Sequence, residues 1–136
     1  MLKSLFSLTL LLGLAAAAPS TEPPVVIELF TSQGCSSCPP ADRLLATLAR
    51  DPGVIAVSRP VTYWDRLGWK DTLAREENTR RQYAYAARFR RDGVYTPQAV
   101  VDGRYQTVGS DREALVALLA TARRAAGWMT STTGTG

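Results

Sequence analysis

The sequence predicts an α/β domain in which a central mixed sheet of about four strands is flanked by helices, in the order β-α-β-α-β-β-α. Short runs rich in Val alternate with longer stretches whose apolar residues repeat at helical spacing. The first two runs, 25–30 and 54–57, are separated by one helical stretch, a pattern typical of parallel strands joined by a crossover helix. The last two runs are joined by Asp102-Gly103, a dipeptide that favours a tight hairpin.

The first strand, residues 25–30, is apolar on both faces except at Glu28, as expected for a central strand covered on both sides. A carboxylate in such a strand is costly unless it is paired or protonated. Two interpretations remain open at this point. Glu28 is either the proton acceptor for Cys38, as part of a proton relay, or the ion-pair partner of a cation such as Arg59.

A helix is expected to begin near Pro39 and Pro40, because a missing backbone N–H removes little at a helix start. It should run to about Arg50, where an Asp-Pro-Gly sequence ends it. The second strand, 54–57, follows directly, and Pro60 limits how far it can continue in a sheet interior.

The second half of the domain should contain a helix, a hairpin and a final helix. Residues 72–89 are polar at first and then show a helical pattern, and 99–101 and 104–108 are the hairpin strands. The sequence Ser-Asp-Arg-Glu at 110–113 matches a capping box, so the last helix should begin there and end near Gly127.

The ends of the chain predict export and a short tail. Residues 1–18 have the features of a signal peptide, with Lys3 followed by the apolar run 5–14 and small residues. The apolar run is shorter than the ~20 residues of a spanning helix, so we expect no stable membrane span after cleavage, with an uncleaved anchor as the alternative. The domain should then comprise 19–128, and the Thr/Ser/Gly-rich segment 129–136 should be disordered.

The composition argues against several kinds of catalytic and metal-binding site. The chain of 136 residues is long enough for one domain. It contains no His, which removes mechanisms that depend on imidazole, and two cysteines alone do not complete a structural zinc site. We therefore expect no metal and no cofactor. The net charge of +4 is mild and the Arg residues are scattered, which favours solvated helix faces over a nucleic-acid surface.

The sequence Gly34-Cys35-Ser36-Ser37-Cys38 lies between the first strand and the first helix. Two intervening residues allow a disulfide across the first turn of a helix. Free N–H groups and the positive end of the helix dipole favour a thiolate there, so Cys35 is predicted to be the attacking sulfur. Cys38, one turn further in, should be more covered and should resolve the mixed disulfide.

An aromatic loop containing Tyr63, Trp64 and Trp69 follows the second strand. Such a loop can form a lid or recognition surface beside the cysteines, or an apolar flap that closes the core. Both interpretations remain open.

The order of elements, with Cys35 and Cys38 opening the first helix and Thr96-Pro97 before the third strand, resembles the thioredoxin fold. The resemblance implies a cis-proline at Pro97 that faces the disulfide, although an ordinary trans-proline at a strand start is the alternative. It also implies that Thr96, Pro97 and Gly34 contact the backbone of an extended substrate.

At closer range the chain resembles the DUF1223 family of secreted thioredoxin-like proteins. The matching stretches are 26–42, 63–71, 94–98 and 100–103, of which the first is highly specific. This resemblance implies an exported bacterial protein with a thioredoxin-like fold, and it supplies no substrate.

Two departures from the family pattern stand out. The family usually has Phe-His-Val-Asp before the aromatic loop, where this chain has Arg-Pro-Val-Thr at 59–62. Relatives also commonly continue well beyond the last helix. A truncated family member that lacks a partner or specificity region is therefore one interpretation.

These observations favour a periplasmic or secreted thiol–disulfide oxidoreductase. Cys35 and Cys38 would exchange with protein or peptide thiols and disulfides, and an unidentified redox partner would restore the pair. The alternative is a binding module in which Cys35–Cys38 is a structural disulfide and the aromatic loop contacts a partner. Peroxidase-like reduction ranks lower, because no Arg lies close to the cysteines in sequence.

Overall fold

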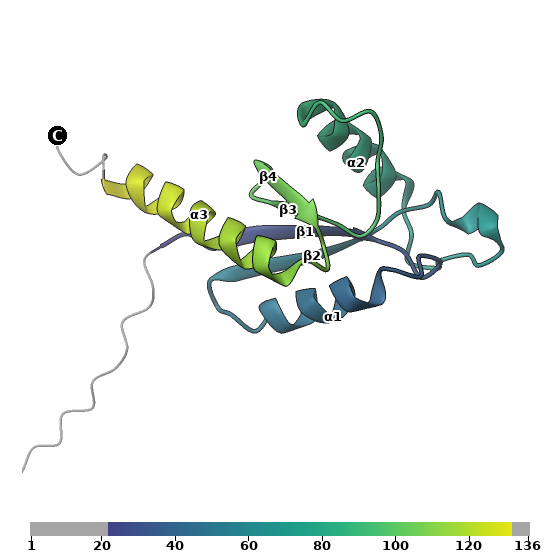
Figure 1. The fold of residues 1–136 in the computed structure, drawn as a ribbon, viewed down its shortest axis with the longest axis horizontal. Helices are drawn as coiled ribbons and strands as arrows, with labels where there is room; N and C mark the ends of the chain where they lie inside the picture. The colour runs from purple at the N-terminus through teal and green to yellow at the C-terminus, as the bar shows by residue number, and fades with distance from the viewer. Residues whose placement is uncertain (1–21, 132–136) are drawn as a thin grey trace, which may run out of the picture.

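The computed structural model describes residues 22–131, with side chains up to residue 127 (Figure 1). The predicted signal peptide, 1–18, lies outside them. The elements, in chain order, are β1 (Val25–Thr31), α1 (Pro39–Leu48), β2 (Val54–Pro60), the 3₁₀ turn η1 (Asp65–Leu67), α2 (Glu76–Arg88), β3 (Gln98–Val101), β4 (Tyr105–Val108) and α3 (Arg112–Ser131). The α/β class and the predicted order of strands and helices are confirmed.

The four strands form one mixed sheet in the order β2-β1-β3-β4. β1 and β2 are parallel, with Val25 opposite Val54, whereas β1 and β3 are antiparallel. β3 and β4 form an antiparallel hairpin whose turn residues, Asp102 and Gly103, both have positive φ, 49° and 65°. Asp-Gly is favoured at turn positions with positive φ, so these two residues by themselves favour the hairpin turn.

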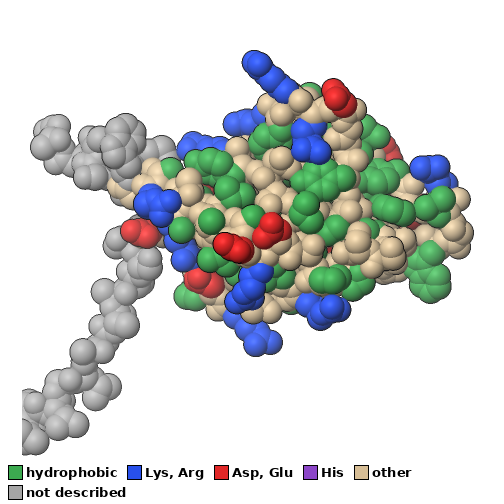
Figure 2. Space-filling view, in the orientation of Figure 1, with side chains coloured by type: hydrophobic (Ala, Val, Ile, Leu, Met, Phe, Trp, Pro, Cys, Tyr) green, Lys and Arg blue, Asp and Glu red, His purple; other side chains and the backbone are tan. Residues whose placement is uncertain are grey.

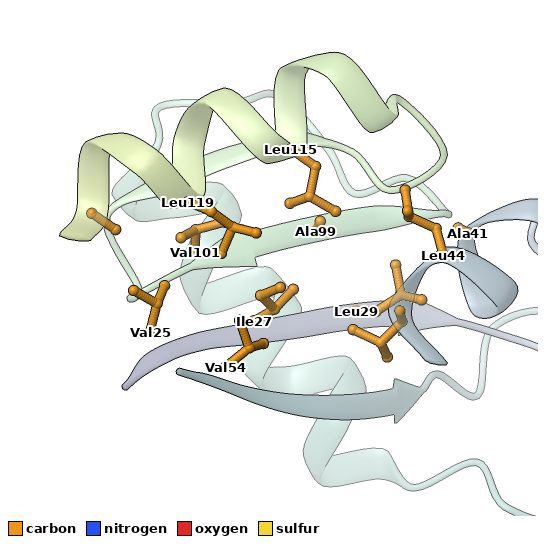
Figure 3. Close-up of a cluster of buried hydrophobic side chains, with 12 residues drawn as sticks. Val25, Ile27, Leu29, Ala41, Leu44, Val54, Ala99, Val101, Leu115 and Leu119 are labelled. Carbon is orange, nitrogen blue, oxygen red and sulfur yellow. The ribbon is translucent and has the colours of Figure 1, made fainter. Parts of the chain in front are cut away.

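The helices cover the two faces of the sheet unequally. α1 and α3 pack on one face, and α2 lies on the other (Figure 1). The larger core lies under α1 and α3, where inward residues of β1 and β3 meet helix side chains (Figure 3). Its members are Val25, Ile27, Leu29, Ala41, Leu44, Leu45, Val54, Ala99, Val101, Leu115, Leu119 and Ala122. A smaller core under α2 contains Phe30, Val61 and Val100, packed against Tyr85 and Phe89.

Several boundaries differ from the sequence-based expectations, among them the end of β2 and both ends of α3. β2 continues to Pro60, which an edge strand permits because its outer side has no ladder partner. The N-cap of α3 is Asp111, whose Oδ1 accepts from the backbone N–H of Ala114 at 3.0 Å. The cap is therefore one residue later than the capping box expected at 110–113, and Ala114 has no side-chain acceptor to complete such a box. α3 also passes through Gly127, which does not adopt the left-handed conformation of a helix-ending glycine, and continues to Ser131. Residues 129–131 of the expected disordered tail are therefore helical, and 132–136 lie outside the described residues.

The surface carries no single concentration of charge on the face shown in Figure 2, where Lys and Arg are spread among apolar and neutral residues. Within residues 22–131, no helix is both long enough and apolar enough to span a membrane.

Candidate functional site

The two cysteines form a disulfide at the entrance to α1. Cys35 and Cys38 are bonded, with their Cα atoms 5.4 Å apart. Cys38 is the N-cap of α1, and its carbonyl oxygen accepts from the N–H of Asp42 at 3.0 Å, while Pro39 is the first helical residue. The prediction that the cysteine pair opens the first helix is confirmed. The pair therefore lies where the helix dipole favours negative charge on sulfur.

Both cysteines are enclosed. Cys35 is 2% exposed and Cys38 is 0% exposed. A Cβ placed on Gly34 would lie 3.4 Å from Trp64 Cβ and 3.6 Å from the carbonyl oxygen of Trp69. The aromatic loop thus packs against the residue that precedes Cys35.

The segment before β3 contacts the disulfide directly. The Thr96–Pro97 peptide bond is cis, as predicted. Thr96 Oγ1 donates to Cys35 Sγ at 3.2 Å and accepts from Trp64 Nε1 at 2.8 Å. The structure therefore brings together Thr96, Cys35 and Trp64, although a substrate-binding role for Thr96, Pro97 and Gly34 stays a prediction.

The three aromatic residues of the loop have different environments. Tyr63 and Trp64 pack against the small core under α2, so this part of the loop is a flap. The Tyr63 hydroxyl donates to Gln82 Oε1 at 2.9 Å, and burial raises the pKa of Tyr63 to about 12 in spite of that hydrogen bond. Trp69, in contrast, is 64% exposed, and its Nε1 donates to Gln33 Oε1 at 3.2 Å.

A buried aspartate, which sequence reasoning did not single out, fastens the loop to the disulfide segment. Asp71 is 2% exposed, and its Oδ2 accepts from the backbone N–H of Gln33 at 2.9 Å. Its Oδ1 accepts from the N–H of Leu73 at 2.8 Å, and its own N–H donates to Asp65 Oδ1 at 3.0 Å. The available signal was the pair Asp65 and Asp71, which stand at the two ends of the Asp-Arg-Leu-Gly-Trp-Lys-Asp sequence. Asp71 therefore holds the aromatic loop in register with the residues just before Cys35.

Glu28 lies on the other face of the sheet. Side chains alternate along β1, so Leu29 faces α1 and Glu28 faces α2. Glu28 Oε1 accepts from Arg59 Nε at 2.9 Å and from Arg81 Nε at 2.6 Å, while Oε2 accepts from Arg81 Nη2 at 3.0 Å and from the Tyr85 hydroxyl. The ion pair with Arg59 is confirmed, and no hydrogen bond found among residues 22–131 joins Glu28 to Cys38. The relay interpretation has no contact to support it.

Burial of Glu28 acts to raise the pKa of its carboxyl group. The hydrogen bonds from Arg81 and Tyr85, together with the charges of Arg81 and Arg59, outweigh burial and hold this pKa below its ordinary value. Glu28 is therefore an ionised structural residue in the cluster formed by Glu28, Arg59, Arg81 and Tyr85.

The part of the chain that the structure describes contains no group of three or more His, Cys, Asp or Glu side chains arranged to hold a metal ion. The chemistry available at the disulfide is that of sulfur, supported by the Thr96 hydroxyl and by Ser37, whose Oγ lies 3.5 Å from Cys35 Sγ.

The sheet order, the disulfide at the start of α1 and the cis-proline before β3 together define a thioredoxin-like domain. Within that class, the chain belongs to the family described as "protein of unknown function (DUF1223)", whose model matches residues 26–135.

Two further comparisons agree with this class. A crystal structure of a protein from Agrobacterium tumefaciens superposes with a TM-score of 0.72 at 46% identity, covering 77% of this chain and 48% of that chain. A protein named "Probable Thioredoxin" from Archaeoglobus fulgidus is 40% identical over 37 residues, which is 27% of this chain and 41% of that protein. The chain thus spans less than half the length of each of these proteins.

Proposed function

We propose that the protein is an exported thiol–disulfide oxidoreductase that uses Cys35 and Cys38 as its redox pair. One observation carries the proposal: the disulfide lies at the N-terminus of α1, with Cys38 as the N-cap, and the hydroxyl of Thr96 donates to Cys35 Sγ at 3.2 Å. A thiolate formed at Cys35 on reduction gains from both the helix terminus and this donor. Export to the periplasm or out of the cell is proposed from the signal-like residues 1–18.

The reaction is two successive exchanges at sulfur. In the reducing direction, the Cys35 thiolate attacks a substrate disulfide; a Cys35–substrate S–S bond forms, the substrate S–S bond breaks, and the released thiolate takes a proton from solvent. The Cys38 thiolate then attacks Cys35 Sγ, which forms the internal disulfide and releases the second substrate thiol. Two electrons pass from the protein to the substrate, and a dithiol donor must reduce Cys35–Cys38 again. Oxidation of a substrate dithiol uses the same bonds in reverse.

The substrate is a protein or peptide, held by the backbone near Gly34, Thr96 and Pro97. The aromatic loop contributes an apolar surface next to this position. Three of its side chains are strongly exposed: Leu67 at 63%, Trp69 at 64% and Leu73 at 64%. Exposed large apolar side chains favour contact with another polypeptide.

A second candidate function is favoured by the burial of both cysteines. In this alternative, Cys35–Cys38 is a permanent structural disulfide and the exposed side chains Leu67, Trp69 and Leu73 bind a partner. A disulfide across only two intervening residues adds little loop-closure stability, which weakens this alternative.

A redox titration separates the two functions. The purified protein is equilibrated in a series of glutathione or dithiothreitol buffers, its free thiols are alkylated, and the disulfide fraction is read by mass. A midpoint between roughly −120 and −270 mV supports exchange, whereas a midpoint well below about −300 mV supports a structural disulfide. The Cys38→Ser variant provides a further check, because an exchanger lacking Cys38 should accumulate mixed disulfides through Cys35.

The export proposal has its own test. Residues 1–24 are fused to a reporter enzyme that is active only outside the cytoplasm, with Leu10→Arg as the matched control that interrupts the apolar run. Activity of the native fusion and loss of activity in the variant support export, and an inactive native fusion contradicts it.

A further inference from the structure

We propose that Trp64 is a positioning residue for Cys35 and acts through Thr96. The indole N–H of Trp64 orients the Thr96 hydroxyl so that the hydroxyl proton points to Cys35 Sγ and stabilises the thiolate form of that sulfur. This inference rests on the proposed function, because it concerns the sulfur that would exchange with substrate.

The direction of both hydrogen bonds follows from the groups involved. An indole nitrogen can only donate, so Thr96 Oγ1 must be the acceptor in its 2.8 Å contact with Trp64 Nε1. A sulfur in a disulfide carries no proton, so it can only accept in its 3.2 Å contact with Thr96 Oγ1. A hydroxyl has one proton and two lone pairs. The contact from Trp64 occupies a lone pair, so the single proton stays available for donation to Cys35.

Packing holds the indole in the place where it makes this contact. Trp64 is half-buried, its ring lies 6.4 Å from that of Tyr63, and its Cβ is the nearest neighbour of a Cβ built on Gly34, at 3.4 Å. The loop is further fixed through Asp71, which accepts from the N–H of Gln33. The donor therefore approaches Thr96 from a fixed direction, which limits the rotation of the hydroxyl.

A second acceptor lies close to the same hydroxyl. Thr96 also interacts with the hydroxyl of Tyr63, whose own proton goes to Gln82 Oε1. The Thr96 proton can therefore be drawn either to the Tyr63 oxygen or to Cys35 Sγ. A thiolate is the stronger acceptor because it is charged, and donation from Trp64 makes the Thr96 hydroxyl a stronger donor to it.

The test measures the thiolate fraction of Cys35 at neutral pH in the reduced protein, carrying Cys38→Ala so that one sulfur titrates. Thiolate is read from its ultraviolet absorbance and, independently, from the rate of alkylation by iodoacetamide. The variants are T96V, T96S, W64F and the W64F/T96V pair. The matched control is W69F, because Trp69 is the other indole of the loop and donates to Gln33 rather than to Thr96.

The variants should lower the ratio of thiolate to thiol by different amounts. T96V lowers the ratio of thiolate to thiol about tenfold, since a hydrogen bond to a charged group is lost, whereas T96S keeps the native ratio. W64F lowers the ratio by about twofold, the size expected from a polarising neighbour, and W69F leaves it unchanged. In the T96V background, W64F has no further effect, because its action requires the hydroxyl.

Two results overturn the proposal: W64F has no effect while Thr96 is present, or W64F has the same effect in the native and T96V backgrounds. If W64F does not fold, hydrogen exchange of the Trp64 indole N–H replaces it as the readout. The Trp64 indole N–H should exchange faster in T96V than in the native protein, and at the native rate in T96S. Equal exchange rates in the two variants contradict the hydrogen bond between Trp64 and Thr96. These assays use no substrate, so they can fail while the redox titration supports exchange, or succeed while that titration shows a structural disulfide.

Discussion

Replacing Glu28 with Gln tests whether the buried carboxylate is a structural ion or a proton relay. Glu28 is 3% exposed and accepts from four donor groups on Arg59, Arg81 and Tyr85. The amide keeps one acceptor oxygen but turns an NH₂ group toward these donors, so about two charge-assisted hydrogen bonds are lost. Each contributes about 1.5–3 kcal/mol, and rehydration of the partly exposed arginines offsets some of the loss. We expect the free energy of unfolding to fall by about 2–3 kcal/mol.

The pH dependence of the free energy of unfolding is a second test of the same prediction. The pKa of Glu28 in the folded protein lies below its ordinary value of 4.5, because the hydrogen bonds and charges of its partners outweigh burial. The unfolded chain therefore binds more protons in acid than the folded one. The stabilisation is present in full above the ordinary value and is lost as the pH falls through the folded-state pKa. The difference between the native protein and Glu28→Gln should therefore be largest at neutral pH and should shrink in acid.

Urea unfolding at a series of pH values measures both effects. Asp51→Asn is the matched control, because Asp51 is an exposed carboxylate paired with Arg123, and its loss should have little effect. The reasoning is refuted if Glu28→Gln costs no more than Asp51→Asn, or if its cost is the same in acid as at neutral pH. We also expect the rate at which Cys38 resolves a mixed disulfide to be unchanged in Glu28→Gln. A slower rate in a folded variant would support the relay interpretation.

Two further predictions concern residues that hold the site together. Gly109→Ala should lower the free energy of unfolding by about 1–3 kcal/mol in chemical denaturation, because its Cβ would lie 2.5 Å from Leu29 Cδ1 inside the core. Gly93→Ala, where no atom lies within 4 Å, is the control, and an equal loss in both variants contradicts the packing argument. Asp71→Asn should cost about 1–2 kcal/mol and speed hydrogen exchange at the Gln33 amide, since an NH₂ group then faces a backbone donor. Native protection of that amide in the variant would show that Asp71 does not hold the loop.

Much of the site could be predicted because its signals are local. The spacing of Cys35 and Cys38, the two prolines after them and the preceding strand together identify a cysteine pair at a helix start. The Thr96-Pro97 sequence could be placed only through the resemblance to the thioredoxin fold, which implies a cis-proline facing the disulfide. The contacts between the aromatic loop and the disulfide could not be predicted, because nothing in residues 63–71 specifies which distant side chains they meet.

Glu28 illustrates the limit of sequence reasoning. The sequence showed that a carboxylate inside an apolar strand needs a partner, and Arg59 was named. It could not show that Arg81 and Tyr85 complete the cluster, since they are 53 and 57 residues away and reach Glu28 only when α2 packs on that face of the sheet. It also could not settle which face Glu28 occupies, because both neighbours in the strand are apolar.

The sequence by itself determined the α/β class, the order of elements, the Asp102-Gly103 hairpin and the position of the cysteine pair. These depend on backbone preferences and on residues close together in the chain, which any reader of the sequence can evaluate. Only the tertiary structure decided that Trp64 donates to Thr96 and Thr96 to Cys35, pairs separated by 32 and 61 residues. Such contacts arise from the packing of the loop, the sheet and α1 against one another, and this packing sets the direction of a single hydroxyl proton at the sulfur.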